Sequence, residues 1–225
     1  MSVVKLKRDD SQAADTSQAA VWKGDFGREY TDRNTLDAVG LDDLYRKNYG
    51  LTRTEINANF LADIPKEASF LEVGCNTGNQ LLMLNRMGWS NLSAVELQPY
   101  AAEIASQRLS ESLVKLGSAL AVPFADSAFD VVFTSGVLIH IAPKDLPRAL
   151  DEIHRTSRRY IWGLEYYAPE VTEVTYRSHS SLLWKMDFVR RYLERFDDLE
   201  LVKEQRLPYL NSENVDTVFL LKKRR

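Results

Sequence analysis

A glycine-rich turn preceded by an acidic residue is the segment of this 225-residue chain best suited to bind a ligand. The stretch Glu72-Val-Gly74-Cys-Asn-Thr-Gly78 follows a short apolar run and precedes a helical pattern. Glycine permits a positive φ and the close approach of a ligand, and free N–H groups at a helix start attract anions. Because ligands of open α/β sheets bind beyond the carboxyl ends of the strands, this turn predicts a cofactor site.

The residue types around the turn favour one class of cofactor. Asn76 stands where a dinucleotide fingerprint has its middle glycine, and no Gly-Lys-Ser/Thr follows, which excludes a P-loop. The carboxylate of Glu72 would repel a phosphate, but it suits a ligand with a cationic end. Glu96 lies about 20 residues after Gly74, where a carboxylate accepts hydrogen bonds from ribose hydroxyls. The two carboxylates favour S-adenosylmethionine (SAM) over NAD; the alternative is a tight turn with two solvated glutamates.

Candidates for acid–base chemistry follow the fourth and fifth predicted strands. An alcohol acceptor of a methyl group loses a proton as the new bond forms, so it needs a base within hydrogen-bond reach. His140 is either this base or a residue that satisfies a backbone carbonyl at a turn. Glu165 and Tyr167 share a direction because strand residues alternate, and one of them is a candidate for the wall of an acceptor pocket. The alternative for Tyr166 or Tyr167 is an amphipathic position in the core.

The irregular, aromatic-rich stretch 168–185 is expected to contact the acceptor, because long loops in compact domains often bind ligands. Arg177 offers a planar fork for a carboxylate or phosphate, and Lys185 adds a second positive charge. The alternative for Lys185 is a surface ion pair with Asp187, which is also a candidate cap for the helix after it. The expected substrate contacts are Tyr176, Arg177, His179 and Lys185.

Alternating strand and helix patterns must position these residues. Strand patterns occur at 69–74, 92–97, 112–117, 128–136, 159–167, 199–207 and 217–224, and helical patterns at 79–87, 99–109, 146–154 and 188–196. A Thr-x-x-Glu capping box at Thr52 and Glu55 opens an earlier helix whose face carries Ile56, Phe60 and Ile64. The predicted fold class is α/β, a doubly wound, seven-stranded, mostly parallel sheet with an antiparallel last strand and an N-terminal helical cap. We expect a mobile tail at 1–19 and one domain at 20–225, with the cap at 20–66 and the cofactor-binding sheet at 67–225.

The composition limits the class of protein. The chain has 29 Lys+Arg and 32 Asp+Glu, a net charge of −3, which argues against a broad nucleic-acid surface. No apolar run approaches the ~20 residues of a membrane span, and the N-terminus lacks the apolar region of a signal peptide. Cys75 is the single cysteine and cannot form an internal disulfide, so we expect a reducing, cytoplasmic compartment. No side chains show metal-site spacing, and no metal is expected.

The chain resembles the class I SAM-dependent methyltransferases over residues 68–225. The resemblance rests on Glu72, Gly74, Gly78, Glu96 and the segment 117–130. Ser118 stands where the family commonly has an aspartate facing the adenine amino group, and the segment 156–159 replaces the usual Gly-Gly turn before the fifth strand. The expected cofactor contacts are Tyr30, Arg33, Asn34, Glu72, Gly74, Cys75, Asn76, Gly78, Glu96, Leu97, Ser118, Ala119 and Thr134.

A narrower resemblance is to the methylases associated with pseudaminic acid (nonulosonic sugar) biosynthesis. It is carried by Trp22, Phe26-Gly27, Tyr30, Arg33-Asn34, Glu72-x-Gly74-x-Asn76-x-Gly78, Val137–Ile141, Glu165–Tyr167, Tyr176-Arg177 and Leu183–Phe188, with Ser178 in place of an expected glycine. The resemblance implies methyl transfer to a small polar acceptor, an oxygen of such a sugar or of a related sugar or carboxylate metabolite. The segment from Trp22 to Asn34 would form a lid over the cofactor, with Arg33 at the methionine carboxylate, or else pack on the sheet as an aromatic helix.

Three other functions stay open at this point: a methyltransferase of protein or tRNA, a SAM-binding module without activity, and a nucleotide-sugar or NAD enzyme on a related sheet. No nucleic-acid or membrane partner is expected, and the oligomeric state is not specified by the sequence.

Overall fold

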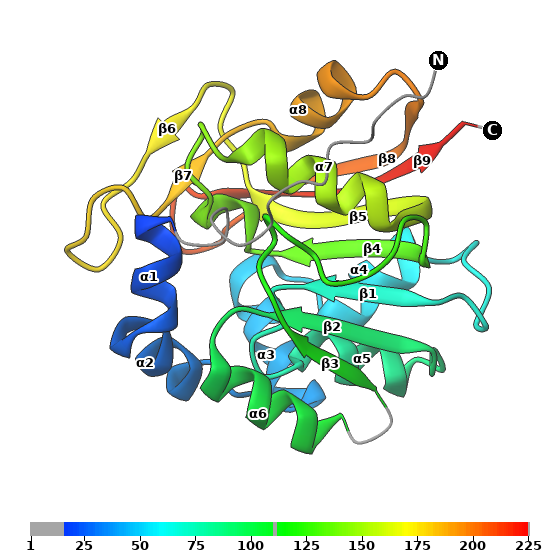
Figure 1. The fold of residues 1–225 in the computed structure, drawn as a ribbon, viewed down its shortest axis with the longest axis horizontal. Helices are drawn as coiled ribbons and strands as arrows, with labels where there is room; N and C mark the ends of the chain where they lie inside the picture. The colour runs from blue at the N-terminus through cyan, green and yellow to red at the C-terminus, as the bar shows by residue number, and fades with distance from the viewer. Residues whose placement is uncertain (1–15, 110–111, 225) are drawn as a thin grey trace, which may run out of the picture.

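The structure is a computed structural model that describes residues 16–109 and 112–224. Its centre is a seven-stranded sheet with the strand order β3-β2-β1-β4-β5-β9-β8 (Figure 1). The strands are β1 (Phe70–Val73), β2 (Leu92–Glu96), β3 (Leu113–Leu116), β4 (Phe129–Ser135), β5 (Ser157–Tyr166), β8 (Leu199–Pro208) and β9 (Val215–Lys223). Strands β1 to β5 pair in parallel, and β9 runs antiparallel to both β5 and β8. The predicted sheet with its antiparallel last strand is confirmed.

Helices cover both faces of the sheet, because successive strand residues point to opposite sides. Phe70 and Val131 join a core with residues of α3 (Ala38–Tyr49), α4 (Arg53–Phe60), α5 (Asn79–Arg86) and α6 (Pro99–Arg108). The next residues, Leu71 and Val132, join a second core with α7 (Leu146–Thr156) and α8 (Phe188–Arg195). In Figure 1, α7 lies in front of the sheet and α4 behind it.

The capping box that opens α4 forms as predicted. Thr52 Oγ1 accepts a hydrogen bond from the Glu55 N–H at 3.0 Å, and Glu55 Oε2 accepts one from the Thr52 N–H at 2.7 Å. The helix ends at Phe60, however, so Ile64 is a buried residue beyond the helix rather than part of its face. Helix α3, which precedes α4, was not among the predicted elements.

The N-terminal segment differs from its prediction in two ways. Residues 1–15 lie outside the described part of the chain, but Ser17 already begins helix α1 (Ser17–Lys23), whose Thr16 cap accepts a hydrogen bond from the Ala19 N–H at 3.1 Å. The predicted end of the tail at residue 19 is therefore wrong. Helices α1 and α2 (Asp25–Arg33) lie beside the edge where the parallel strands end (Figure 1), whereas α3 and α4 cover a face of the sheet.

The stretch 168–185, predicted to be irregular, contains regular structure. Strands β6 (Thr172–Glu173) and β7 (Trp184–Lys185) form a two-stranded antiparallel ribbon. Between them, Tyr176 and His179 exchange backbone hydrogen bonds of 2.8 and 2.9 Å across a tight turn. The ribbon escaped prediction because two-residue strands leave too short a pattern to recognise.

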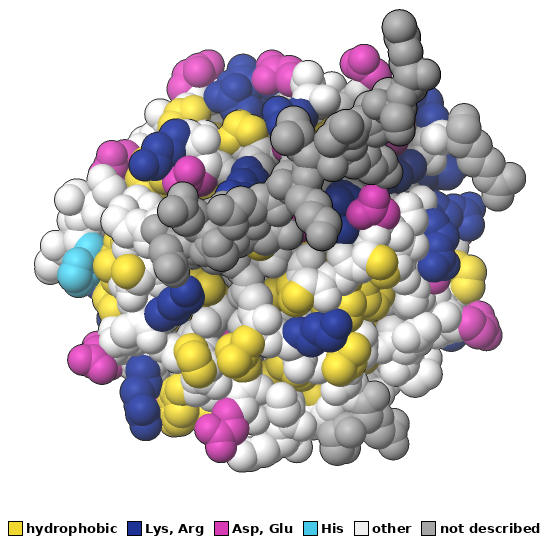
Figure 2. Space-filling view, in the orientation of Figure 1, with side chains coloured by type: hydrophobic (Ala, Val, Ile, Leu, Met, Phe, Trp, Pro, Cys, Tyr) yellow, Lys and Arg dark blue, Asp and Glu magenta, His cyan; other side chains and the backbone are white. Residues whose placement is uncertain are grey.

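Charges of both signs occur on the one face of the molecule that Figure 2 draws. On the face drawn in Figure 2, outside the grey atoms, basic and acidic side chains are interspersed and form no continuous basic stripe. Within the described residues, no helix has both the length and the apolar character needed to cross a membrane.

Candidate active site

A cavity of about 450 Å³ lies at the carboxyl ends of the parallel strands. The predicted cofactor residues that line it are Tyr30, Asn34, Glu72, Gly74, Cys75, Asn76, Glu96, Leu97, Ser118 and Ala119. The predicted catalytic or substrate residues that line it are His140, Glu165, Tyr176 and Arg177. One cavity therefore joins most of the expected cofactor contacts to several of the expected acceptor contacts.

The glycine turn needs a residue without a side chain at Gly74. Its φ is +79°, and its N–H donates to the carbonyl of Val95 at 2.8 Å. A Cβ at this position would lie 2.7 Å from Cγ2 of Val137, which begins the turn after β4. The backbone of the first strand turn therefore packs directly against the turn of the fourth strand.

Glu96 holds the same turn from β2. Its Oε2 accepts a hydrogen bond from the Asn76 N–H at 2.7 Å, and its Oε1 accepts from the N–H groups of Leu97 and Gln98, both at 2.8 Å. Burial raises the pKa of Glu96, and the three N–H donors oppose that rise. This carboxylate is thus a structural part of the site as well as the expected ribose ligand.

Glu72 is a buried carboxylate that lacks a partner. Only 2% of the residue is exposed, and its Oε2 has no hydrogen-bond partner among the described residues. Burial and the nearby Glu96 raise the pKa of Glu72, while Arg53 lowers it. The Oδ1 of Asn76 is a second buried acceptor without a partner. Since buried polar groups are normally satisfied, these acceptors suit a ligand that brings hydrogen-bond donors and a positive charge.

The N-terminal helices are fastened at two points to the cofactor half of the cavity. Gln98 Nε2 donates to the carbonyls of Lys23 and Gly24 at 2.8 and 3.0 Å. Asn79 Nδ2 donates to the carbonyl of Asn34 at 2.6 Å. These hydrogen bonds hold the junction between α1 and α2, and the end of α2, beside the glycine turn. Neither Gln98 nor Asn79 was singled out from the sequence.

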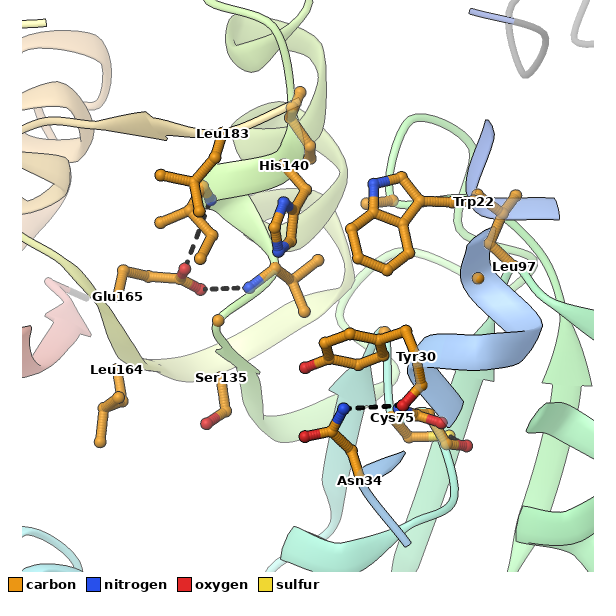
Figure 3. A pocket seen from close by; sticks show the side chains of 18 of the residues that line it. Trp22, Tyr30, Asn34, Cys75, Leu97, Ser135, His140, Leu164, Glu165 and Leu183 are labelled. Atoms are coloured by element: carbon orange, nitrogen blue, oxygen red, sulfur yellow. Dashed lines mark hydrogen bonds between the residues drawn. The ribbon is translucent and has the colours of Figure 1, made fainter. Parts of the chain in front are cut away.

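His140 ends the 3₁₀-helix η1 (Leu138–His140) that follows β4. Its Nδ1 lies 2.7 Å from the carbonyl oxygen of Leu182, which can only accept, so Nδ1 carries the proton and Nε2 is left as an acceptor. Burial lowers the pKa of His140 to about 4, which keeps the ring neutral at physiological pH. Its ring centroid is 4.5 Å from that of Trp22 (Figure 3). The centroid of the Tyr176 ring lies 5.5 Å away. His140 therefore satisfies a carbonyl and still has one nitrogen free to take a proton.

Two substitutions of His140 separate these roles. In His140→Asn the amide nitrogen takes the position of Nδ1 and keeps the bond to Leu182, but nothing replaces Nε2. We expect kcat to fall about 100-fold if Nε2 is the base, with the SAM dissociation constant within about threefold of wild type. His140→Gln, which loses the Leu182 bond, controls for the loop. If His140→Asn turns over at the wild-type rate, the histidine has only the structural role.

Glu165 accepts hydrogen bonds from backbone N–H groups of the η1 turn. Its Oε1 accepts from the Val137 N–H at 3.2 Å, and its Oε2 lies 3.4 Å from the Ile139 N–H (Figure 3). Thr134, predicted to contact the cofactor, instead donates its hydroxyl to Glu165 and does not line the cavity. Burial raises the pKa of Glu165 to about 7, against the effect of these donors. The geometry makes Glu165 a positioning residue for the turn that carries His140.

Five further predicted residues do not line the cavity; they are Arg33, Gly78, Tyr167, His179 and Lys185. Arg33 pairs with Glu29 at 3.6 Å along α2, and its contact with a methionine carboxylate stays a prediction. The exposed His179 packs its ring 5.1 Å from that of Phe26. Gly78 precedes α5 as its N-cap and so shapes the turn without reaching the cavity.

The side chains of Tyr167 and Lys185 contact residues outside the cavity wall. The guanidinium carbon of Arg206 lies 3.6 Å from the centre of the Tyr167 ring. Lys185 donates its ammonium to the side-chain oxygen of Asn214, and not to Asp187. The capping prediction for Asp187 is confirmed, since its side chain accepts from the Arg190 N–H at 2.9 Å.

Sequence reasoning missed a polar cluster on the β5–β9 side of the cavity. The lining residues of this cluster are Tyr45, Tyr49, Tyr166, Tyr209 and Asp216. A signal for Asp216 was present in the sequence, because it stands immediately before the antiparallel strand predicted at 217–224, and such a strand begins at the edge where its parallel neighbours end. No comparable signal marked Tyr45 and Tyr49, which lie on the unpredicted helix α3.

Part of the chain is similar in sequence to known proteins. Residues 71–159 match the family model described as a methyltransferase domain. This match spans less than half of the chain and shows similarity to a methyltransferase domain over that segment. The chain is also 35% identical over 88 residues to malonyl-(acyl-carrier protein) O-methyltransferase of Serratia marcescens. That match covers 39% of this chain and 33% of the relative, so the chain spans about a third of that relative's length.

Several solved structures share the fold of this chain. The 1,6-didemethyltoxoflavin-N1-methyltransferase of Burkholderia thailandensis, bound to 1,6-didemethyltoxoflavin and S-adenosylhomocysteine, has a TM-score of 0.70 at 18% identity, over 92% of this chain and 89% of its own. A geranyl diphosphate methyltransferase has a TM-score of 0.61 at 12% identity, over 76% of each chain. The (4+2)-cyclase SpnF has a TM-score of 0.61 at 14% identity, over 76% of this chain and 79% of its own. Because a cyclase shares the fold, the fold does not by itself determine the activity.

Proposed function

We propose that this chain is a SAM-dependent methyltransferase that methylates a small polar acceptor, an oxygen of a nonulosonic (pseudaminic-type) sugar or of a related metabolite. The observation that carries the proposal is the single cavity, which joins the orphaned carboxylate of Glu72 and the turn-binding Glu96 to His140 and Arg177. The sugar rests on the sequence resemblance. A small acceptor agrees with two structural neighbours, whose names specify 1,6-didemethyltoxoflavin and geranyl diphosphate.

The residues present fit the cofactor. Glu72 would receive the cationic methionine end, Glu96 the ribose hydroxyls, and Ser118 the adenine side. SAM, when bound, supplies a methyl group on a positively charged sulfur. Glu96 keeps the turn in place through the Asn76 N–H, so the binding surface is largely formed before the cofactor arrives.

The acceptor side supplies a base and a cation. Nε2 of His140 is positioned to take the proton of an acceptor hydroxyl, while the Leu182 carbonyl holds the ring in the required tautomer. The exposed guanidinium of Arg177 lines the same cavity and offers a partner for an acidic group of the acceptor. Much of the rate gain would come from holding the two reactants in a reactive pose.

Calorimetry and a labelled-methyl assay test this proposal together. We expect SAM to bind in preference to NAD, and the label to appear in a small metabolite whose mass rises by one methyl group. Label in total RNA or protein would favour the macromolecular alternative, SAM binding without turnover on any extract would favour a non-catalytic module, and preference for NAD would exclude the proposal.

A further inference from the structure

Asp216 is a buried carboxylate in the cavity wall that the proposed chemistry leaves without a role. It pairs with Tyr166 in the β5–β9 ladder, which brings the start of β9 to the ligand edge of the sheet. Only 2% of the residue is exposed, and it lines the cavity beside Tyr49, Tyr166 and Tyr209.

The two oxygens of Asp216 differ in their hydrogen bonding. The Tyr49 hydroxyl donates to Oδ2 at 2.5 Å, and the Tyr209 hydroxyl lies 3.3 Å from the same oxygen. Oδ1 has no hydrogen-bond partner among the described residues. A buried acceptor left in this state costs free energy, which a donor from a ligand would recover.

The charges around Asp216 favour a neutral donor. Burial raises the pKa of Asp216 to about 6, and the Tyr49 and Tyr209 hydroxyls, Lys185 and Arg53 oppose that rise, so the carboxylate is ionised at neutral pH. Lys185 and Arg53 both lower the pKa of Asp216, so positive charge is already present near the carboxylate. An anionic ligand group would be repelled by the Asp216 carboxylate. A hydroxyl would donate a hydrogen bond to Oδ1 without adding a charge to the cavity.

We propose that Asp216, held by Tyr49 and Tyr209, binds a hydroxyl of the methyl acceptor and so selects acceptors that carry a hydrogen-bond donor at this point. The proposal rests on the proposed function, since it assumes that this part of the cavity holds the acceptor. It adds a specificity residue on β9 to an acceptor site otherwise built from the β4 turn and the ribbon segment.

A pair of matched probes tests the subsite on the wild-type protein. Binding of cis-1,2-cyclohexanediol and of its dimethyl ether, which keeps the carbon skeleton but has no donor, is measured by ligand-observed NMR with the protein saturated by S-adenosylhomocysteine. We expect the diol to bind at least about tenfold more tightly than the ether. Equal binding of the two probes would overturn the proposal.

Asp216→Asn replaces Oδ1, the hydrogen-bond acceptor without a partner, by a hydrogen-bond donor. The amide oxygen takes the place of Oδ2 under the two tyrosine hydroxyls, so the NH₂ group replaces the acceptor Oδ1. We expect diol affinity to fall about tenfold while S-adenosylhomocysteine affinity stays within about threefold, and Asp198→Asn, which removes a carboxylate paired with His154 away from the cavity, to change neither.

The design separates the two proposals. If the wild-type protein does not bind S-adenosylhomocysteine, the proposed function fails and the subsite fails with it. If it binds the cofactor product but does not discriminate diol from ether, only the Asp216 proposal fails. Should Asp216→Asn not fold, the comparison of the two probes on the wild-type protein still decides.

Discussion

Replacing Gly74 by alanine is expected to weaken SAM binding about 100-fold. The added Cβ would lie 2.7 Å from Cγ2 and 3.0 Å from Cγ1 of Val137, and the φ of +79° adds backbone strain. Because the Val137 N–H donates to Glu165, pushing Val137 away also disturbs the turn that carries His140. One methyl group would thus displace both halves of the site. Titration calorimetry with SAM measures the effect.

Gly88→Ala is the matched control for this substitution. Gly88 also has a positive φ, +96°, but a Cβ there would meet only the Lys66 side chain at 3.8 Å, and Gly88 does not line the cavity. We expect Gly88→Ala to lower stability by about 1 to 3 kcal/mol while SAM affinity stays within about threefold. If Gly74→Ala binds SAM as tightly as Gly88→Ala does, the turn does not form the cofactor site.

The cofactor half of the site was predictable because its parts are close in sequence. A strand, a glycine turn and a helix start are consecutive from Phe70 to Asn79, and the acid on the next strand follows at a characteristic distance. The local pattern singled out Glu72, Gly74, Asn76 and Glu96, and these four residues line one cavity; their contact with a cofactor stays a prediction. The pattern did not predict that Glu96 accepts hydrogen bonds from three backbone N–H groups. These hydrogen bonds depend on the folded conformation of the turn.

The acceptor half was harder to predict because it is assembled from distant elements. Asp216 meets Tyr49 across 167 residues of sequence, and His140 meets Leu182 across 42. His140 and Glu165, which were singled out by their position after a strand, line the cavity. Tyr167 does not; it lies one residue beyond the end of β5 and packs against Arg206. Long-range pairing of this kind leaves no periodic signal.

The predicted cap was only partly right for a related reason. Helix α3 combines buried Leu41 and Tyr45 with half-buried and exposed residues of mixed type, and the sequence does not show which surface it covers. In the structure α3 and α4 complete one face of the sheet, and α1 and α2 extend over its ligand edge.

The second large effect is expected from Glu165→Gln, as a change in how stability depends on pH. The folded protein holds the Glu165 proton with a pKa of about 7, and an unfolded glutamate has a pKa of about 4.3. Proton binding therefore stabilises the fold fully below the unfolded value, and this stabilisation is lost as the pH rises through about 7. Between about pH 5 and pH 8, the free energy of unfolding of the wild type should fall by roughly 2 to 3 kcal/mol more than that of the variant.

Urea unfolding of the ligand-free protein at a series of pH values measures this difference. Asp216, whose pKa is also raised, is present in both proteins and so cancels in the comparison. Glu103→Gln, at an exposed position on α6, should follow the wild-type curve. Parallel curves for wild type and Glu165→Gln would mean that Glu165 is ionised as easily in the fold as in water. In that case the N–H groups of Val137 and Ile139 stabilise its charge more than burial penalises it, and the turn that carries His140 would be held by a charged group throughout the physiological range.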